Sequence, residues 1–309
     1  MSWFKNKPRP VAAPPAAGSP APAPASPSPA GPSAAAAELI RRWDASIADN
    51  RARVQALIDE AVAGSTPLVE TIGTDLTQLV LPWNTLRPRV LHARDELADL
   101  WSRISDEMSA SGAFTHEMIR REGSKRDLAG LELELVHDRA YGGVMARAAE
   151  RMRAAALSTD AGAHACVRCG AMLDKVTPVS QSLNVECAYC KAINTVHPGN
   201  ALRMFAASGA AFLANEEARE AGETMKRIEI QLKQFRDAQD VPLQMLIELE
   251  AASRSYWTTK LNAEARYTPE EAGYVPGKLD RHMQDVQRTL RRYWQWRSHE
   301  AAARSPSTC

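Results

Sequence analysis

The residues with the clearest chemical potential are four cysteines arranged as two Cys-x-x-Cys pairs. Cys166 and Cys169 form the first pair, Cys187 and Cys190 form the second, and residues 170–186 lie between them. Each pair suits a tight turn with both thiolates on one side, and the intervening residues could form a β-hairpin that brings the turns face to face. Four thiolates then form a tetrahedral shell at about 2.3 Å from a metal, as Zn²⁺ prefers. The spacing therefore predicts a structural zinc ion on these four cysteines.

This stretch resembles a zinc ribbon over residues 164–198. Gly170 follows the first pair, Lys191 stands at the matching position of the second, and neither pair has a proline after its first cysteine. The resemblance implies a structural metal and a small β domain that serves as a platform for contacts. Tyr189 is either an exposed anchor or a cover for the metal. The strand residues would be Val176, Val179, Leu183, Val185 and Val196.

Other uses of the thiols are less favoured. A redox dithiol needs only one pair and is expected beside a thioredoxin-like βαβ pattern, which does not surround these pairs. An iron–sulfur cluster also takes four thiolates, but the spacing differs from common ferredoxin runs. His164 and His197 flank the module and are interpreted as surface residues. Cys309, the last residue, is given no role.

Outside this module the apolar residues recur at helical spacing. The chain is rich in Ala, Arg, Leu and Glu, with only 6% aromatic residues, which is typical of long helices. Spacings of four and three alternate in three segments, which predicts heptad seams. Their positions are Trp43, Ile47, Asn50, Val54, Leu57 and Ala61; Val90, Arg94, Leu97, Trp101, Ile104 and Met108; and Leu279, Met283, Val286, Leu290 and Tyr293. A further seam is predicted at Met225, Ile228, Leu232 and Phe235.

Glycine and proline mark the predicted helix ends. Breaks are expected at Gly64–Pro67, at Pro82 and Pro88, at Ser111–Gly112, at Val241–Pro242 and at Pro276–Gly277. Residues 268–271, Thr-Pro-Glu-Glu, are predicted to form a helix-starting capping box.

The predicted fold is all-α, an antiparallel helical bundle or coiled-coil hairpin with a small inserted β zinc ribbon. Helices over residues 114–158 and 199–240 flank the ribbon, which favours a hairpin with the metal at its tip, and a folded-back bundle is the alternative. The predicted divisions are a peptide motif at 1–7, a Pro/Ala-rich disordered linker at 8–33, helices at 34–163, the ribbon at 164–198, helices at 199–304 and a disordered tail at 305–309.

The first residues give a hypothesis about location. The basic N-terminus with Trp3 and Phe4 lacks the apolar core of a signal peptide, and no run of eighteen apolar residues exists. We expect a cytoplasmic protein. Residues 1–7, isolated by the proline-rich linker, are either a docking motif or a start without a role.

No catalytic motif supports an enzyme. Glu134 and His137 have the Glu-x-x-His spacing of a di-iron ligand pair, but no second copy exists, so they are interpreted as part of a solvated helix face. The first functional hypothesis is a non-enzymatic scaffold or adaptor in which the zinc ribbon mediates protein–protein contacts. It has an unidentified protein partner, and homo-oligomers could form through the heptads.

The alternative hypothesis is a nucleic-acid-binding protein. The net charge of +1 excludes binding of polyanions by the whole surface, so a local patch would be needed. The ribbon and the last helix could supply it, because basic and aromatic residues alternate in that helix. They are Arg288, Arg291, Arg292, Tyr293, Trp294, Trp296 and Arg297. An amphipathic bundle helix explains the same residues, except Trp294 and Trp296, which lie off the seam.

Overall fold

The structure is a computed structural model that describes residues 34–71, 76–160, 164–173, 181–235 and 241–304, without the side chains of 159–160, 292 and 294–304. Its elements are α1 (Ala34–Thr71), α2 (Thr77–Ala110), α3 (His116–Asp160), β1 (Leu183–Glu186), β2 (Ile193–Val196), α4 (Asn200–Met204), η1 (Phe205–Gly209), α5 (Ala210–Glu217), α6 (Arg219–Lys233), α7 (Leu243–Tyr267), η3 (Pro269–Tyr274) and α8 (Val275–Arg304). The described chain is thus mostly helical with a small antiparallel hairpin inserted between α3 and α4, which confirms the predicted fold class.

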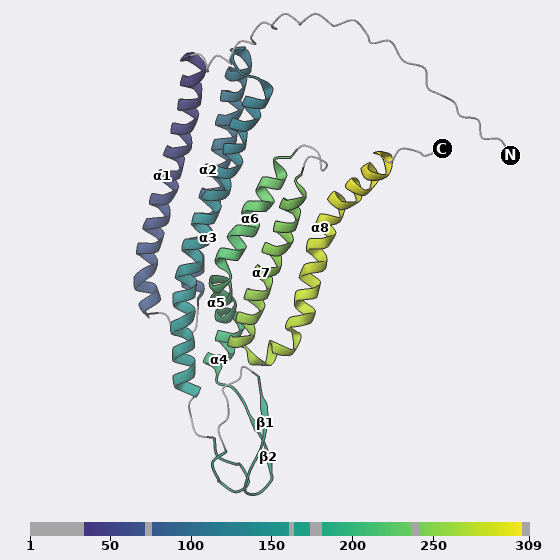
Figure 1. The fold of residues 1–309 in the computed structure, drawn as a ribbon. Coiled ribbons are helices and arrows are strands. Elements are labelled where there is room, and N and C mark those ends of the chain that lie inside the picture. The colour runs from purple at the N-terminus through teal and green to yellow at the C-terminus, as the bar shows by residue number, and fades with distance from the viewer. Residues whose placement is uncertain (1–33, 72–75, 161–163, 174–180, 236–240, 305–309) are drawn as a thin grey trace, which may run out of the picture.

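Helix α2 runs antiparallel to both α1 and α3, and the three helices pack on one another in the first part of the molecule (Figure 1). Large apolar side chains at predicted seam positions fill the space between them, each at most 2% exposed: Trp43, Val54, Leu97, Ile104 and Met108. The polar seam residue Asn50 is buried too, because its Nδ2 donates a hydrogen bond to the carbonyl oxygen of Ala93 at 3.0 Å. The heptad pattern is therefore satisfied within the chain.

The prediction that Arg94 lies in a heptad seam is wrong. Ala93 enters the core at 4% exposed, whereas Arg94 is exposed and donates a hydrogen bond from Nη1 to Glu134 Oε1 at 2.8 Å. Both residues fit a spacing of three and four between Val90 and Leu97, so periodicity alone does not separate them. The small alanine is preferred inside because a buried guanidinium would need a buried partner.

The predicted breaks at three prolines are also wrong. Pro67 lies within α1, which continues to Thr71, and Pro82 and Pro88 lie within α2, which begins at Thr77. All three prolines are exposed, and so are the residues four positions before them, whose carbonyl groups lose a helical partner. Water can bond to those carbonyl groups, and packing of the opposite face holds the helix together.

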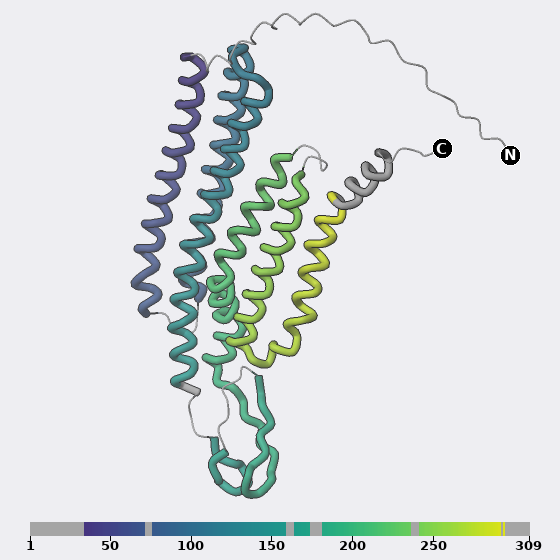
Figure 2. The backbone as a smooth tube through the Cα atoms, viewed as in Figure 1, coloured from purple at the N-terminus to yellow at the C-terminus, as the bar shows by residue number. Residues whose placement is uncertain are grey.

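Helix α3 is shared between two layers of the fold. It packs on α1 and α2, and it also contacts α4, η1 and α5 and, more weakly, α6. The chain therefore runs along α3 to the β-hairpin and returns through α4 to α6, while α7 folds back beside α6 and α8 folds back beside α7 (Figures 1 and 2). The predicted hairpin and the folded-back bundle are thus both present.

The returning chain contains a π-helical turn at η1. Phe205 begins this turn and is 1% exposed. A Cβ atom added to Gly209 would lie only 2.6 Å from Cδ2 of Phe205. The glycine thus leaves room for the Phe205 ring at the point where the helix changes its hydrogen-bond register.

A second and smaller core lies between α6, α7 and α8. It contains Leu232, Val241, Leu246, Leu249 and Leu290, and the predicted seam residues Met225, Ile228, Phe235, Val286 and Tyr293 pack against it. Polar contacts connect α6 to α3, since Lys226 Nζ lies 2.8 Å from Asp138 Oδ2 and Arg139 Nη2 lies 2.7 Å from Glu223 Oε2. The two apolar cores are separate clusters joined by ion pairs.

The C-terminal breaks differ from the prediction in two places. The Thr268 hydroxyl does not cap the next turn but donates to the carbonyl oxygen of Glu264 at 2.8 Å, and η3 is a 3₁₀ turn. Helix α8 begins at Val275 and includes Pro276 and Gly277 in its first turn. A proline in the first turn of a helix has no hydrogen bond to lose, so Pro276 is compatible with helix there.

Candidate metal centre

The cysteine module lies at the end of the molecule where α3 ends and α4 begins (Figure 1). Strands β1 and β2 pair antiparallel, with Leu183 opposite Val196 and Glu186 opposite Ile193. The hairpin therefore encloses the second cysteine pair, whereas the sequence predicts a hairpin between the two pairs. The predicted strand residues Val176 and Val179 lie outside the described residues.

The two Cys-x-x-Cys turns, or knuckles, share one pattern of backbone hydrogen bonds. In the first, the N–H of Cys166 donates to Ala171 O at 2.8 Å and the N–H of Gly170 donates to Cys166 O at 2.9 Å. In the second, Cys187 donates to Ala192 O at 2.9 Å and Lys191 to Cys187 O at 3.0 Å. Equivalent positions of the two knuckles are thus related by a local two-fold pattern. The thiols of each knuckle point toward those of the other.

The residue after each pair has a positive φ. The angle is +73° at Gly170 and +59° at Lys191. A side chain in this left-handed conformation costs about 1 kcal/mol, and glycine avoids that cost. The tight knuckle therefore explains the glycine of the first pair, and the second knuckle forms in spite of Lys191.

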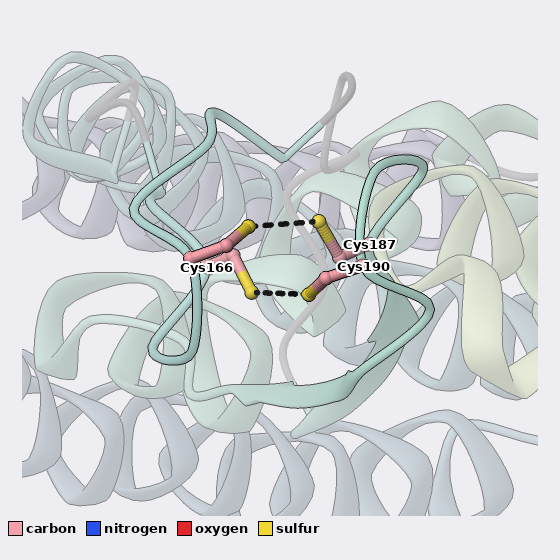
Figure 3. A group of neighbouring side chains, drawn as sticks. Cys166, Cys187 and Cys190 are labelled. Atoms are coloured by element: carbon pink, nitrogen blue, oxygen red, sulfur yellow. Dashed lines mark hydrogen bonds between the residues drawn. The ribbon is translucent and has the colours of Figure 1, made fainter.

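The four sulfur atoms form a compact group. Cys166 Sγ lies 3.6 Å from Cys190 Sγ, and Cys169 Sγ lies 3.7 Å from Cys187 Sγ, so each short contact joins opposite knuckles (Figure 3). All four sulfur atoms lie within 4.8 Å of one another. Tetrahedral metal–sulfur bonds of about 2.3 Å place the sulfurs about 3.8 Å apart. The four cysteines are therefore positioned to bind a metal ion.

Backbone amides around the sulfurs favour a thiolate at one position. The N–H of Cys169, followed by that of Arg168, lowers the pKa of Cys166 to about 6. The N–H of Ala171 acts in the same direction on Cys169, but the hydrogen bond with Cys190 and the other thiols raises the pKa of Cys169 to about 12. Crowded thiols cannot all ionise alone, so a bound cation is needed to make four thiolates.

One further residue of the site was not found from the sequence. Asn194, on β2, is 3% exposed and accepts a hydrogen bond from the N–H of Val167 at Oδ1, at 2.9 Å. Its Nδ2 donates to Ala192 O at 2.9 Å. A single asparagine within a strand has no spacing pattern, and only its position between the knuckles distinguishes it.

The flanking residues do not join the sulfur group. His197 is exposed and its Nδ1 lies 2.8 Å from Ser182 Oγ, and His164 is half-buried with its carbonyl oxygen bonded to the N–H of Leu173. Neither histidine belongs to the group of potential ligands. Tyr189 is 81% exposed, which favours the exposed anchor over the cover for the metal. Cys309 lies outside the described residues.

The other candidate motifs are not assembled into a site. Glu134 is paired with Arg94, but the predicted solvated helix face is wrong for His137, which is 4% exposed and packs edge-on against Trp83 at 5.7 Å between ring centroids. In the described parts of the chain, the four cysteines are the only group of three or more potential metal ligands. Arg291 is exposed on α8, but the side chains of Arg292, Trp294, Trp296 and Arg297 are outside the description.

Comparison with known proteins does not identify this arrangement. No protein-family model matches the chain, and no curated protein or solved structure is significantly similar to it. Among the described helices, none is both long enough and apolar enough to cross a membrane. The cysteine centre and the surface around it are therefore the features of the described chain that bear on function.

Proposed function

We propose that the four cysteines hold one structural Zn²⁺ ion in a zinc ribbon. Four sulfur donors suit zinc better than they suit Mg²⁺ or Ca²⁺, which prefer oxygen ligands. A closed shell of four thiolates leaves no position for a substrate or a water molecule. The metal would thus stabilise the knuckles and would not take part in a reaction.

We further propose that this ribbon is the contact surface of a non-enzymatic adaptor. The observation that carries this proposal is the exposure of apolar side chains around the knuckles: Val167 is 90% exposed, Tyr189 81%, Ile193 71% and Met172 53%. These exposed fractions show that the described helices do not cover these side chains. Clustered apolar exposure of this kind is typical of a protein-binding site.

The helical body is then a scaffold that presents the ribbon at one end. The heptad positions Trp43, Val54, Met283 and Leu290 are buried in the packing of the chain itself, so these four are not available to a second copy. The proposal therefore assigns the contact to a different protein, with an apolar patch that covers Val167 and Tyr189.

Affinity capture with quantitative mass spectrometry tests the adaptor. The full chain is compared with a Val167→Ser/Tyr189→Ser/Ile193→Ser variant, and Tyr274→Ser is the matched control because Tyr274 is 65% exposed on η3 in the helical body. We expect a protein that is retained by the wild type and by the control in high salt and lost by the ribbon variant.

Binding to nucleic acid would give a different result. Affinity would fall steeply with salt and would depend on Arg291, Arg292 and Arg297. If the captured material is nucleic acid with this salt dependence, or if no protein depends on the ribbon residues, the adaptor proposal fails.

A further inference from the structure

Asn194 connects the two halves of the metal centre. Its Oδ1 accepts from the N–H of Val167, which lies inside the first Cys-x-x-Cys turn, at 2.9 Å. Its Nδ2 donates to Ala192 O, which belongs to the second knuckle, also at 2.9 Å. The two sulfur pairs add further contacts between the described residues of the two knuckles.

The local two-fold pattern shows that this connection is not a general part of a knuckle. Asn194 follows Cys190 by four positions, and the residue at the matching position after Cys169 is Leu173. Leu173 is 8% exposed and belongs to the small apolar cluster under the knuckles. A leucine therefore suffices for packing at this position, and the amide of Asn194 adds polar contacts that Leu173 lacks.

We infer that Asn194 is a positioning residue that holds the two knuckles in register around the metal. A buried amide that satisfies one donor and one acceptor is costly to move, because either group would be left unpaired. Its partner Val167 directly follows the ligand Cys166, so the amide also positions the turn that carries this ligand. Groups around metal ligands act in this way when they fix ligand orientation.

This inference rests on the proposed metal site but makes a separate claim. Without Asn194 the two knuckles would be joined through the apolar cluster and the thiols alone. Like-charged thiolates repel one another, so a compact group of four sulfurs needs support from other residues as well as from the metal. Removal of that support should weaken metal binding even though all four ligands are present.

The test uses the full chain with Asn194→Leu, a change of similar size that copies the residue at position 173. Asn194→Ala repeats the test with a smaller side chain if leucine is not accommodated. The control is Asn184→Ala, since Asn184 on β1 is exposed and its Oδ1 accepts from Thr195 Oγ1 at 2.9 Å. Zinc affinity is measured by competition with a chromophoric chelator, and exchange of the Val167 amide hydrogen is measured in the presence of excess zinc.

We expect Asn194→Leu to bind zinc about 10–100-fold more weakly than the wild type. The control should change affinity by no more than about two-fold. The Val167 amide should be protected in the wild type and exchange faster in Asn194→Leu, while thermal unfolding of the helices is unchanged. A residue that served packing alone would leave Val167 exchange as it was.

The inference is overturned if Asn194→Leu binds zinc as the wild type does, if its loss equals that of the control, or if Val167 stays protected. If wild-type protein binds no metal, the proposed zinc site fails instead. The amide exchange of Val167 still decides in that case whether Asn194 holds the knuckles together.

Discussion

At the scale of single residues, two positive φ angles mark the positions where the chain turns back to close each knuckle. Gly170 and Lys191 follow their cysteine pairs and bond back to Cys166 and Cys187 in the same way. One of the two positions carries a side chain and the other does not. The cost of a left-handed side chain can therefore be measured in one protein at two equivalent sites.

Substitution at these positions should change zinc affinity in opposite directions. Gly170→Ala should weaken binding by about 1 kcal/mol, because alanine disfavours the left-handed conformation. Lys191→Gly should strengthen binding or leave it unchanged, since it relieves the same cost, and the ion pair with Glu186 at 3.5 Å is exposed. Chelator competition measures both. Equal loss in the two variants would contradict the assignment of the left-handed residues.

Asp138 is the residue whose ionisation is most clearly linked to the fold. Burial alone would raise the pKa of its carboxyl group, but hydrogen bonds from His137 and Lys226 outweigh burial and lower it to about 2. A lowered pKa means that the folded state favours the charged carboxylate. Its contribution to stability is therefore complete above the unfolded value near 3.9 and is lost as the pH falls through about 2.

We expect Asp138→Asn to lower the free energy of unfolding at pH 7 by no more than about 1 kcal/mol, because Asp138 and Lys226 are both partly exposed. The difference from the wild type should shrink as the pH falls from about 4 towards 2. Urea unfolding followed by circular dichroism at pH 7, 4 and 3 measures it. Lys226→Met should add little in the Asp138→Asn background, and a difference that grows in acid would refute the linkage.

At the scale of elements, the π-helical turn η1 is the feature that sets the path of the returning chain. It lies between α4 and α5, where the chain packs on α3, and it places the Phe205 ring in the core. The ring of Phe205 also meets the Tyr267 ring of α7 edge-on, with centroids 6.2 Å apart. The turn thus connects α3 with α7 through one aromatic side chain.

Two glycines give a matched test of this element. Gly209→Ala should destabilise the protein by about 1–3 kcal/mol, because the new methyl group would overlap with Phe205. Gly143→Ala, in α3, has no atom within 4 Å of the added carbon and should stabilise by about 0.5–1 kcal/mol. Chemical denaturation compares the two. Tolerance of alanine at position 209 would show that the Phe205 ring moves freely.

At the scale of the whole molecule, the described residues form three apolar clusters, and packing of α5 on α7 links the first two. One lies between α1, α2, α3 and α5, a second between α6, α7 and α8, and a third consists of the cysteine knuckles. The third contains Cys166, Leu173 and Cys187 but no helical residue. A cluster this small cannot stabilise a domain without a metal or disulfides.

Metal removal should therefore unfold the ribbon and leave the helices intact. With a strong chelator, or in a Cys166→Ser/Cys187→Ser variant, we expect the far-ultraviolet helical signal to change little. Limited proteolysis should then cut within residues 164–198, a region that the zinc-loaded protein protects. Elemental analysis should find one zinc per wild-type chain. Collapse of the helical signal on chelation would show that the metal supports the whole fold.

Local spacing was sufficient for much of this architecture. The positions of Cys166, Cys169, Cys187 and Cys190 predicted the group of four sulfurs, since a tight turn brings residues three apart in the chain to one side. Heptad spacing predicted the buried faces at Trp43, Val54, Met283 and Leu290 for a similar reason. These features depend on neighbours within a few residues, so one sequence contains the information.

Tertiary structure decided the features that depend on distant partners. Pro67 and Pro88 remain within helices because packing on the opposite face outweighs one lost hydrogen bond. The choice of Ala93 over Arg94 depends on α1 and Asn50, and the role of Asn194 depends on a backbone amide twenty-seven residues away. The exposure of Tyr189 depends on the absence of a covering helix among the described residues. Such contacts join residues that are far apart in the sequence, so they leave no regular spacing in it. Only the folded chain shows which partners meet.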